Sequence, residues 1–204
     1  IKADTFFDKN PETVSLISVK TGVNYVMIVS TTAGLWRYNI GDTIQFTSLK
    51  PYRVIVSGRI KHFISAFGEH VIVSEVEQAL QQVVSGAKEE ILIREFTVAP
   101  QISPTKGLPF HEWYIEFDVL PEDLDQFAFE VDKAMISKNI YYKDLIVGKI
   151  LRPLVIRQVA KGGFKSYMKS IGKLGGQNKV PRVSDNRKIA DQLDSLLDLK
   201  TINS

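Results

Sequence analysis

The character of the chain changes close to residue 60, and this change restricts the folds that the sequence can form. Before that point, β-branched and aromatic runs alternate with glycine turns. Beyond it, apolar residues recur at helical spacing between further strand-like runs. We therefore expect an α+β protein, in which a β-rich, barrel-like part over residues 1–60 precedes a small mixed sheet with flanking helices over residues 61–204.

The β-rich part is expected to contain two hairpins and one further strand. Glycine turns at Thr21-Gly22 and Ile40-Gly41-Asp42 separate the members of each hairpin. The predicted strands are Thr13–Lys20, Asn24–Ser30, Leu35–Tyr38, Thr43–Thr47 and Tyr52–Ser57.

The second part is expected to contain three strands and four helices. The predicted strands are Glu90–Ala99, Phe110–Val119 with one buried face, and Leu154–Val159. The predicted helices are Glu75–Val84 with Ser74 as its cap, Pro121–Lys138, Phe164–Ile171 and Asn186–Leu197. Residues 139–150 fit either a short helix or an irregular segment.

Composition excludes several classes of function. The net charge of +3 is too small to indicate a nucleic-acid-binding protein. The chain has no cysteine, and its three histidines, His62, His70 and His111, lack metal-ligand spacing. No apolar run is long enough to cross a bilayer and no signal peptide is visible, so we expect a cytoplasmic protein without a membrane partner. The chain starts at Ile1, and we expect further residues to precede it.

The tract around residue 60 contains three polar residues with two interpretations each. Asp42 after Gly41 is typical of a turn, which its position alone favours; the alternative is a carboxylate that accepts hydrogen bonds from two adjacent hydroxyls, as on a ribose. Arg59 and Lys61 form either a solvated surface pair or a phosphate contact beside a hinge. The change of pattern favours a domain boundary here under both interpretations.

A second candidate site is the glycine-rich basic loop Gly172–Arg182. Its glycines would let backbone N–H groups approach an anion, although the order of residues is not that of a P-loop. A flexible surface loop is the alternative. Lys179 differs from the other lysines, because Pro181 restricts Val180 to extended conformations and stiffens the segment. By contrast, His111 and Glu112 should point to opposite faces of a strand and cannot easily act together.

In this order, these motifs resemble the C-terminal half of the adenylate-forming enzymes. The superfamily pattern runs from an aromatic residue before Gly-Asp, through Gly-Arg-x-(Asp/Lys) and a Glu-containing helix, to a late lysine. The corresponding residues here are Tyr38 to Asp42, Gly58 to Lys61, Ser74 to Glu77, and Lys179.

Within that superfamily, the chain is most similar to the auxin-responsive acyl acid amido synthetases, the Gretchen Hagen family. The similarity rests on Thr32–Tyr38, Pro153–Arg157, Gly163-Phe164 and above all Gln177–Arg182 (QNKVPR). Gly68–Ser74 (GEHVIVS) is closer to bacterial-type members of the superfamily.

The resemblance implies a two-step ligase. A carboxylic acid would react with ATP and Mg²⁺ to give an acyl-adenylate, which an amine, expected to be an amino acid, would then attack. Asp42 would bind the ribose, Arg59 and Tyr38 would lie near the nucleotide, Lys61 would be the hinge, and Lys179 would contact the α-phosphate. Residues 61–204 would form the mobile lid.

The phosphate-binding loop and the acyl pocket of this superfamily have no counterpart in the 204 residues. We therefore expect this chain to be the C-terminal portion of such a ligase and to be inactive by itself. Two alternatives stay open at this point: a ligase that uses the thiol of coenzyme A as the acceptor, and a non-catalytic binding or regulatory module.

Overall fold

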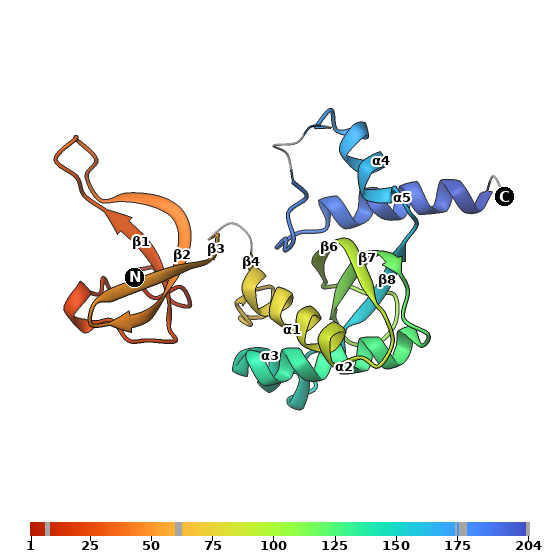
Figure 1. Cartoon of the computed structure of the whole chain (residues 1–204), viewed down its shortest axis with the longest axis horizontal. Coiled ribbons are helices and arrows are strands. Elements are labelled where there is room, and N and C mark those ends of the chain that lie inside the picture. The colour runs from red at the N-terminus through yellow and green to blue at the C-terminus, as the bar shows by residue number, and fades with distance from the viewer. Residues whose placement is uncertain (7–8, 60–62, 174, 176–178, 203–204) are drawn as a thin grey trace. The chain divides into compact units, whose positions relative to one another are not determined.

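The computed structural model describes residues 1–6, 9–59, 63–173, 175 and 179–202 of the chain. It consists of two compact units, the first made of Ile1–Phe63 with Ile72–Ser74, and the second of Ile64–Val71 with Glu75–Ser204 (Figure 1). The α+β class predicted from the sequence is confirmed. The predicted boundary between residues 60 and 61 falls among residues outside the described part, so it stays a prediction.

The first unit is a three-stranded antiparallel sheet. Its strands are β1 (Asn24–Val29), β2 (Tyr38–Leu49) and β3 (Tyr52–Arg59), hydrogen-bonded in that order. Tyr25, Ile44 and Phe46 form its core, and the rings of Tyr25 and Phe46 meet edge to face at 5.9 Å. In the described residues this sheet is open, so the barrel-like shape predicted for this part is not observed.

The predicted strand Thr13–Lys20 is wrong. Leu16–Ser18 forms a short 3-10 helix, which the Ser18 N–H closes by bonding to the Ser15 carbonyl at 3.0 Å. The two apolar side chains of this segment, Leu16 and Ile17, are 53% and 87% exposed. Strand propensity reflects packing of side chains against neighbours, and these two residues have little such packing.

The second unit is built on a mixed sheet in the order β6-β7-β8. The strands are β6 (Leu92–Gln101), β7 (Phe110–Val119) and β8 (Val155–Val159); β7 is antiparallel to β6 and parallel to β8. Ahead of them, β4 (Phe63–Ile64) and β5 (Val71–Ile72) form a two-stranded ladder, at which the chain passes from the first unit into the second.

Five helices accompany these strands: α1 (Val73–Gly86), α2 (Leu124–Lys138), α3 (Ile140–Val147), α4 (Gly163–Ser170) and α5 (Lys188–Ile202). The helix predicted from Pro121 begins at Leu124 instead, and Asp123 caps it by accepting a hydrogen bond from the Gln126 N–H. Asn139 ends α2 and caps α3 through the Tyr142 N–H, so the ambiguous segment is helical. Ser74 lies inside α1 instead of capping it.

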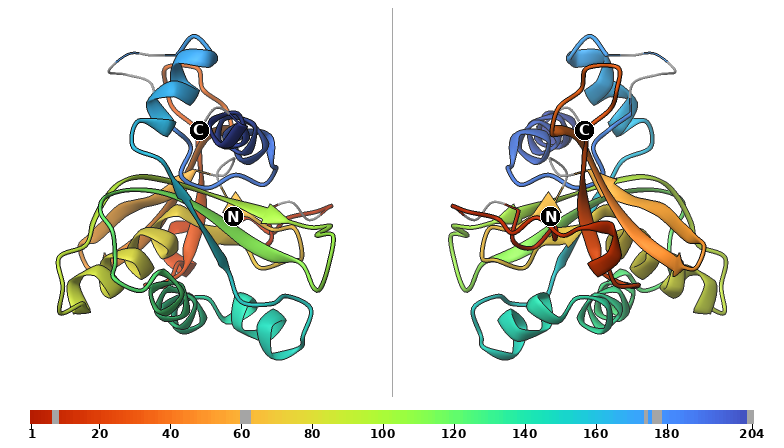
Figure 2. Two further views of the ribbon diagram at one scale, coloured as in Figure 1. Left: turned by 90° about the vertical axis from the view of Figure 1, so that its right-hand side faces the viewer. Right: turned by 90° about the vertical axis from the view of Figure 1, so that its left-hand side faces the viewer.

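The helices of the second unit cover both faces of its sheet. Figure 2 shows α4 and α5 on one face and α1, α2 and α3 on the other. Every residue from Phe110 to Phe117 is buried, because β7 is the central strand of this three-layer arrangement. The prediction that only one face of this strand is buried is therefore wrong. The sequence of the strand is half polar because several polar side chains lie in the interior. Among them, His111, Glu112 and Glu116 have hydrogen-bond partners there.

Candidate functional site

Gly41 and Asp42 lie inside β2, not in a turn between two strands. The pairing with β1 shifts here, from Val26 opposite Thr43 to Ile28 opposite Asn39. Gly41 has a φ of 85°, and its N–H bonds to the side-chain oxygen of Asn39 at 2.8 Å. Glycine is favoured wherever the backbone needs a positive φ, and a bulge in a strand needs a positive φ as much as a turn does. The glycine in the sequence therefore fitted both.

The pairing of β2 with β3 places two of the predicted site residues opposite each other on neighbouring strands. Asp42 of β2 is the register partner of Arg59 at the end of β3. Asp42 is partly exposed, whereas for Arg59 the description covers the backbone alone. Tyr38, at the start of β2, is 52% exposed. The predicted hinge residue, Lys61, lies outside the described residues.

Lys179 extends from a segment that is fixed to the second sheet. We call residues 180–184 the strap. The Val98 N–H of β6 donates to the Arg182 carbonyl at 3.0 Å, and the Ser184 N–H donates to the Val98 carbonyl at 2.9 Å. The Thr97 hydroxyl donates to the Pro181 carbonyl at 2.7 Å. The strap therefore continues the sheet beyond β6, as a parallel bridge from Val98 to Val183.

Side chains hold the strap as well. Val180 and Val183 are buried, and the guanidinium of Arg182 lies over the Phe96 ring at 4.9 Å. Arg182 also forms an ion pair with Glu77 of α1. Lys179 itself is exposed at the start of this anchored segment. The stiffness expected from Pro181 is thus reinforced by contacts that the sequence did not reveal.

A cavity of about 440 Å³ opens beside Lys179. Its walls come from β6 and β7, from α4 and the turn before it, and from Lys173, Gly175, Lys179 and Val180. Four lysines line it: Lys161, Lys165, Lys173 and Lys179. The sequence indicated a basic loop at Gly172–Arg182, but Lys161, before α4, and Lys165, within α4, join the lysines of that loop only through the fold.

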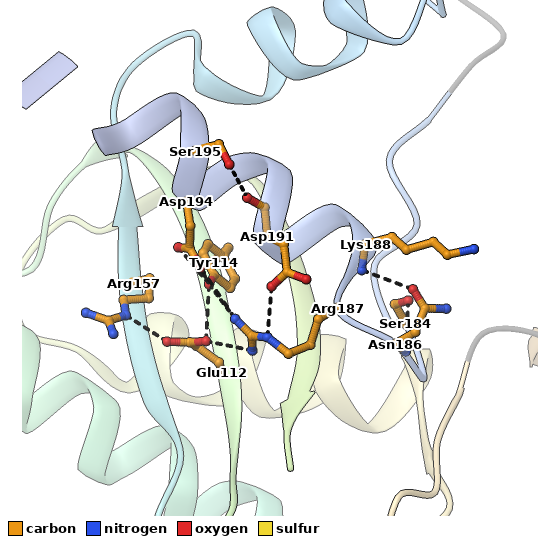
Figure 3. Close-up of polar contacts among 10 residues, drawn as sticks. All are labelled: Glu112, Tyr114, Arg157, Ser184, Asn186, Arg187, Lys188, Asp191, Asp194 and Ser195. Carbon is orange, nitrogen blue, oxygen red and sulfur yellow. Dashed lines mark hydrogen bonds and ion pairs between the residues drawn. The ribbon is translucent and has the colours of Figure 1, made fainter. Parts of the chain in front are cut away.

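A polar cluster of the second unit lies where α5 packs on the sheet (Figure 3). Glu112 of β7 is 2% exposed and accepts hydrogen bonds from Arg157 Nε at 2.7 Å and Arg187 at 2.9 Å. The Tyr114 hydroxyl lies 3.1 Å from Glu112 and 2.8 Å from Asp194. Sequence analysis missed this cluster, because its members are up to 82 residues apart, from Glu112 to Asp194.

The charges and hydrogen bonds of this cluster stabilise the ionised carboxylate of Glu112. Burial alone would raise the pKa of Glu112, but hydrogen bonds from Arg157 and Arg187, together with their charges, lower it overall. Burial and the neighbouring charges of Glu112 and Asp194 raise the pKa of the Tyr114 hydroxyl, which stays protonated. The cluster is therefore a saturated structural network that joins α5 to β7 and β8.

His111 takes part in a second buried network on the opposite face of β7. Its Nε2 lies 2.9 Å from the carboxylate of Glu69, and both side chains are at most 1% exposed. The Phe67 N–H donates to the same carboxylate at 2.8 Å, and the Asn139 amide donates to the Glu69 carbonyl at 3.0 Å. His111 and Glu112 thus point to opposite faces, as predicted, and His111 fixes the segment that follows β4.

The described residues have neither a metal-binding cluster nor a membrane-spanning helix. These residues contain no group of three or more His, Asp or Glu side chains that could hold a metal ion. In the same part of the chain, none of the helices has the length and apolar character that spanning a bilayer requires.

Comparison with known protein families places both parts of the chain. Residues 1–59 match the GH3 family central domain, and residues 74–188, more than half of the chain, match the GH3 family C-terminal domain. The chain belongs to the GH3 family. The resemblance inferred from Lys179 and its neighbours is thereby confirmed at the level of the family.

Several plant members of the GH3 family are similar to this chain. A probable indole-3-acetic acid-amido synthetase GH3.11 from Oryza sativa subsp. japonica is 29% identical over 96% of this chain and 34% of its own length. The indole-3-acetic acid-amido synthetase GH3.10 from Arabidopsis thaliana is 27% identical over 89% of this chain and 32% of its own. The chain thus spans about a third of these relatives.

A solved structure shares the fold. The GH3.15 acyl acid amido synthetase superposes with a TM-score of 0.66 at 22% identity, covering 89% of this chain and 35% of the other. The same enzyme in complex with 2,4-DB gives a TM-score of 0.64. At this identity the likeness establishes the arrangement of strands and helices only.

The Glu69–His111 pair makes the stability of this GH3 chain depend on pH. Burial raises the pKa of Glu69, but the hydrogen bond and charge of His111 and the Phe67 N–H outweigh it, so the pKa falls below its usual 4.5. A lowered carboxylate pKa stabilises the fold above the unfolded pKa, and this contribution is lost as pH falls through the folded pKa.

We expect Glu69→Gln to lower the free energy of unfolding by about 1–3 kcal/mol at pH 7 and to flatten its decline below pH 5. Denaturant unfolding between pH 3 and 7 would measure this, with fluorescence of the buried Trp113 as the signal. Glu90→Gln at an exposed site is the control. A decline as steep in Glu69→Gln as in the control would contradict the assignment.

Proposed function

We propose that this chain is the C-terminal portion of an ATP-dependent ligase that activates a carboxylic acid as an acyl-adenylate and transfers the acyl group to an amine. The acceptor we propose is an amino acid. The observation that supports this most is the match to both GH3 domains, together with relatives that are named amido synthetases. We propose a cytoplasmic location for this reaction, where ATP and amino acids are abundant.

The first unit would hold the ribose of ATP. Asp42 offers a carboxylate with two acceptor oxygens, which suits two adjacent hydroxyls. Its register partner Arg59 comes from the neighbouring strand, so a carboxylate and a cation originate side by side at the end of β3. Tyr38, half exposed on the same strand as Asp42, would add contact with the nucleotide.

The second unit would act on the phosphates. Lys179 is an exposed ammonium group on a segment fixed by three hydrogen bonds to β6. Adenylation builds negative charge on the α-phosphate, and a positioned point charge lowers the free energy of that transition state. Lys61, just before β4, would absorb the backbone rotation that carries the second unit between the two half-reactions.

Magnesium would enter this site with the nucleotide. Mg²⁺ is commonly bound through substrate phosphates and one or two carboxylates. When bound, it would neutralise charge on the leaving pyrophosphate. Of the residues in this chain, we assign none as a magnesium ligand.

The assay that tests this function uses the full-length protein that carries this chain. We expect amide product from ATP, a carboxylic acid and amino acids, and no thioester when coenzyme A replaces the amino acid. The 204-residue chain alone should show no pyrophosphate exchange. Thioester product would favour the thiol-acceptor alternative, and absence of any ATP-dependent product from the full-length protein would favour a non-catalytic module.

A further inference from the structure

The four lysines that surround the cavity beside Lys179 have no carboxylate partner among the described residues. Each is exposed at its own position: Lys161 and Lys165 at the start of α4, Lys173 after its end, and Lys179 before the strap. Three carboxylates also line the cavity, but the protein already occupies each of them. With Arg94, the cavity lining carries five cations against three carboxylates, so its net charge is positive.

The three carboxylates are engaged in different ways. Glu116 of β7 is 2% exposed and accepts hydrogen bonds from the N–H groups of Gly162 at 2.7 Å and Phe164 at 3.2 Å. Asp118 accepts from Arg94 Nε at 2.8 Å. Glu95 accepts from the Phe96 N–H at 3.1 Å and lies 3.9 Å from Arg182.

Glu116 also fixes where two of the lysines lie. It occupies the N–H groups at the start of α4, so this helix end is already capped. The turn before α4 is tight, because a Cβ on Gly163 would lie 2.4 Å from Val159 Cγ1. These contacts hold Lys161 and Lys165 at the mouth of the cavity, within or beside the first turn of α4.

Lysines at this end of a helix act against its stability. The helix macrodipole disfavours cations in the first turn by about 0.3–1 kcal/mol each. Lys165 lies in the first turn of α4, whereas Lys161 precedes the capping residue Gly162. The position of Lys165 is thus unfavourable for α4, and a bound anion would offset this penalty.

The chemistry of the cavity favours a ligand with several negative charges. A single carboxylate or phosphate is held best by the planar fork of an arginine, but Arg94, the only arginine of this cavity among the described residues, is already bonded to Asp118. Several lysines are suited instead to an extended anion with many oxygens. A cavity of about 440 Å³ is also large enough for a small ligand.

We propose that this cavity binds a diphosphate group, held by Lys161, Lys165 and Lys173 next to Lys179. The group could come from free pyrophosphate or from the terminal phosphates of a nucleotide. The assignment of pyrophosphate as the physiological source rests on the proposed adenylation reaction, which would release it; the binding itself does not depend on that reaction.

Isothermal titration calorimetry on the 204-residue chain tests the proposal directly. We expect pyrophosphate and a non-hydrolysable ATP analogue to bind at least tenfold more tightly than orthophosphate or AMP. Binding of pyrophosphate alone would identify the released product as the ligand, and equal binding of both would identify the terminal phosphates. Equal affinity for orthophosphate, AMP and pyrophosphate, or no binding of pyrophosphate, would overturn the proposal.

A pair of matched variants locates the site. Replacing Lys161 and Lys165 together by alanine should weaken pyrophosphate binding by about tenfold or more, as the loss of charge-assisted hydrogen bonds does. Replacing Lys106 and Lys143 by alanine removes the same charge from exposed positions outside the cavity and should change the affinity less than twofold. Equal weakening in both variants would show attraction to the net charge only, and would overturn the proposal.

This experiment keeps the proposal separate from the ligase assignment. Calorimetry measures binding without any turnover, so a failure of the full-length protein to form amide would not affect it. Conversely, if the full-length protein formed amide but the chain did not bind diphosphate, the ligase assignment would stand and the cavity would have no part in it.

Discussion

Replacing Lys179 by alanine in the full-length protein is expected to slow acyl-adenylate formation by about a hundredfold to a thousandfold, the usual effect of removing one electrostatic contact to a transition state. The reason is positional as well as electrostatic. Val180 is buried and the strap is bonded to β6, so a neighbouring lysine cannot move into the same place. Pyrophosphate exchange driven by the carboxylic acid measures this step.

The second half-reaction provides an internal comparison. Amine attack on a supplied acyl-adenylate should be nearly unchanged in Lys179→Ala, because no charge then builds on a pyrophosphate leaving group. Lys169→Ala is the control, since Lys169 is exposed on α4 and does not line the cavity beside Lys179. If both half-reactions of Lys179→Ala survived, or both fell equally, Lys179 would not have the role assigned to it.

The second large effect concerns stability. Glu112→Ala is expected to lower the free energy of unfolding by about 3 kcal/mol, because Arg187 and the Tyr114 hydroxyl lose the buried carboxylate that they share and keep only the more exposed Asp194 in common. Arg157 is 57% exposed, so solvent replaces part of its lost contact and keeps the effect at the lower end of the range for buried pairs. Glu112→Gln, which keeps the shape, should cost less.

Denaturant unfolding followed by tryptophan fluorescence can measure this. Trp113 is fully buried in the second unit, whereas the other tryptophan, Trp36, is 82% exposed, so the change in emission reports mainly on the second unit. Asp118→Ala is the matched control. It breaks the Arg94–Asp118 pair at the surface, where a cost below about 1 kcal/mol is expected. A similar cost in both variants would show that the Glu112 cluster adds no particular stability.

The sequence predicted the second unit better than the first, and the reason is physical. The helices of the second unit have periodic patterns that follow from burying one face, as in α1 and α2. In the first unit, Thr13–Lys20 has strand-forming residues, but the Ser18 N–H bonds to the Ser15 carbonyl in a local turn instead of to a neighbouring strand. Gly41 was placed in a turn because turns and bulges share the same requirement for positive φ.

The candidate site was predictable only where its functional residues form a short motif of consecutive residues. Lys179 with Val180 and Pro181, and Gly41 with Asp42, are motifs of this kind. The cavity was not predictable, because α4 and the residues Lys173, Gly175 and Lys179 come together around it only after folding. The Glu112 cluster was missed for the same reason, and because a carboxylate in a strand is read as exposed until its arginine partners are known.

The central position of β7 has a consequence for how members of this family can diverge. Alternate residues of one strand serve separate neighbourhoods: Glu112, Tyr114 and Glu116 face α4 and α5, while His111 and Phe117 face α2 and α3. Substitutions on the face toward α4 and α5 could therefore be matched by substitutions at every second position of β7, without disturbing its packing against α2 and α3. The two sets of alternate side chains on β7 can therefore change independently in evolution, although they share one backbone.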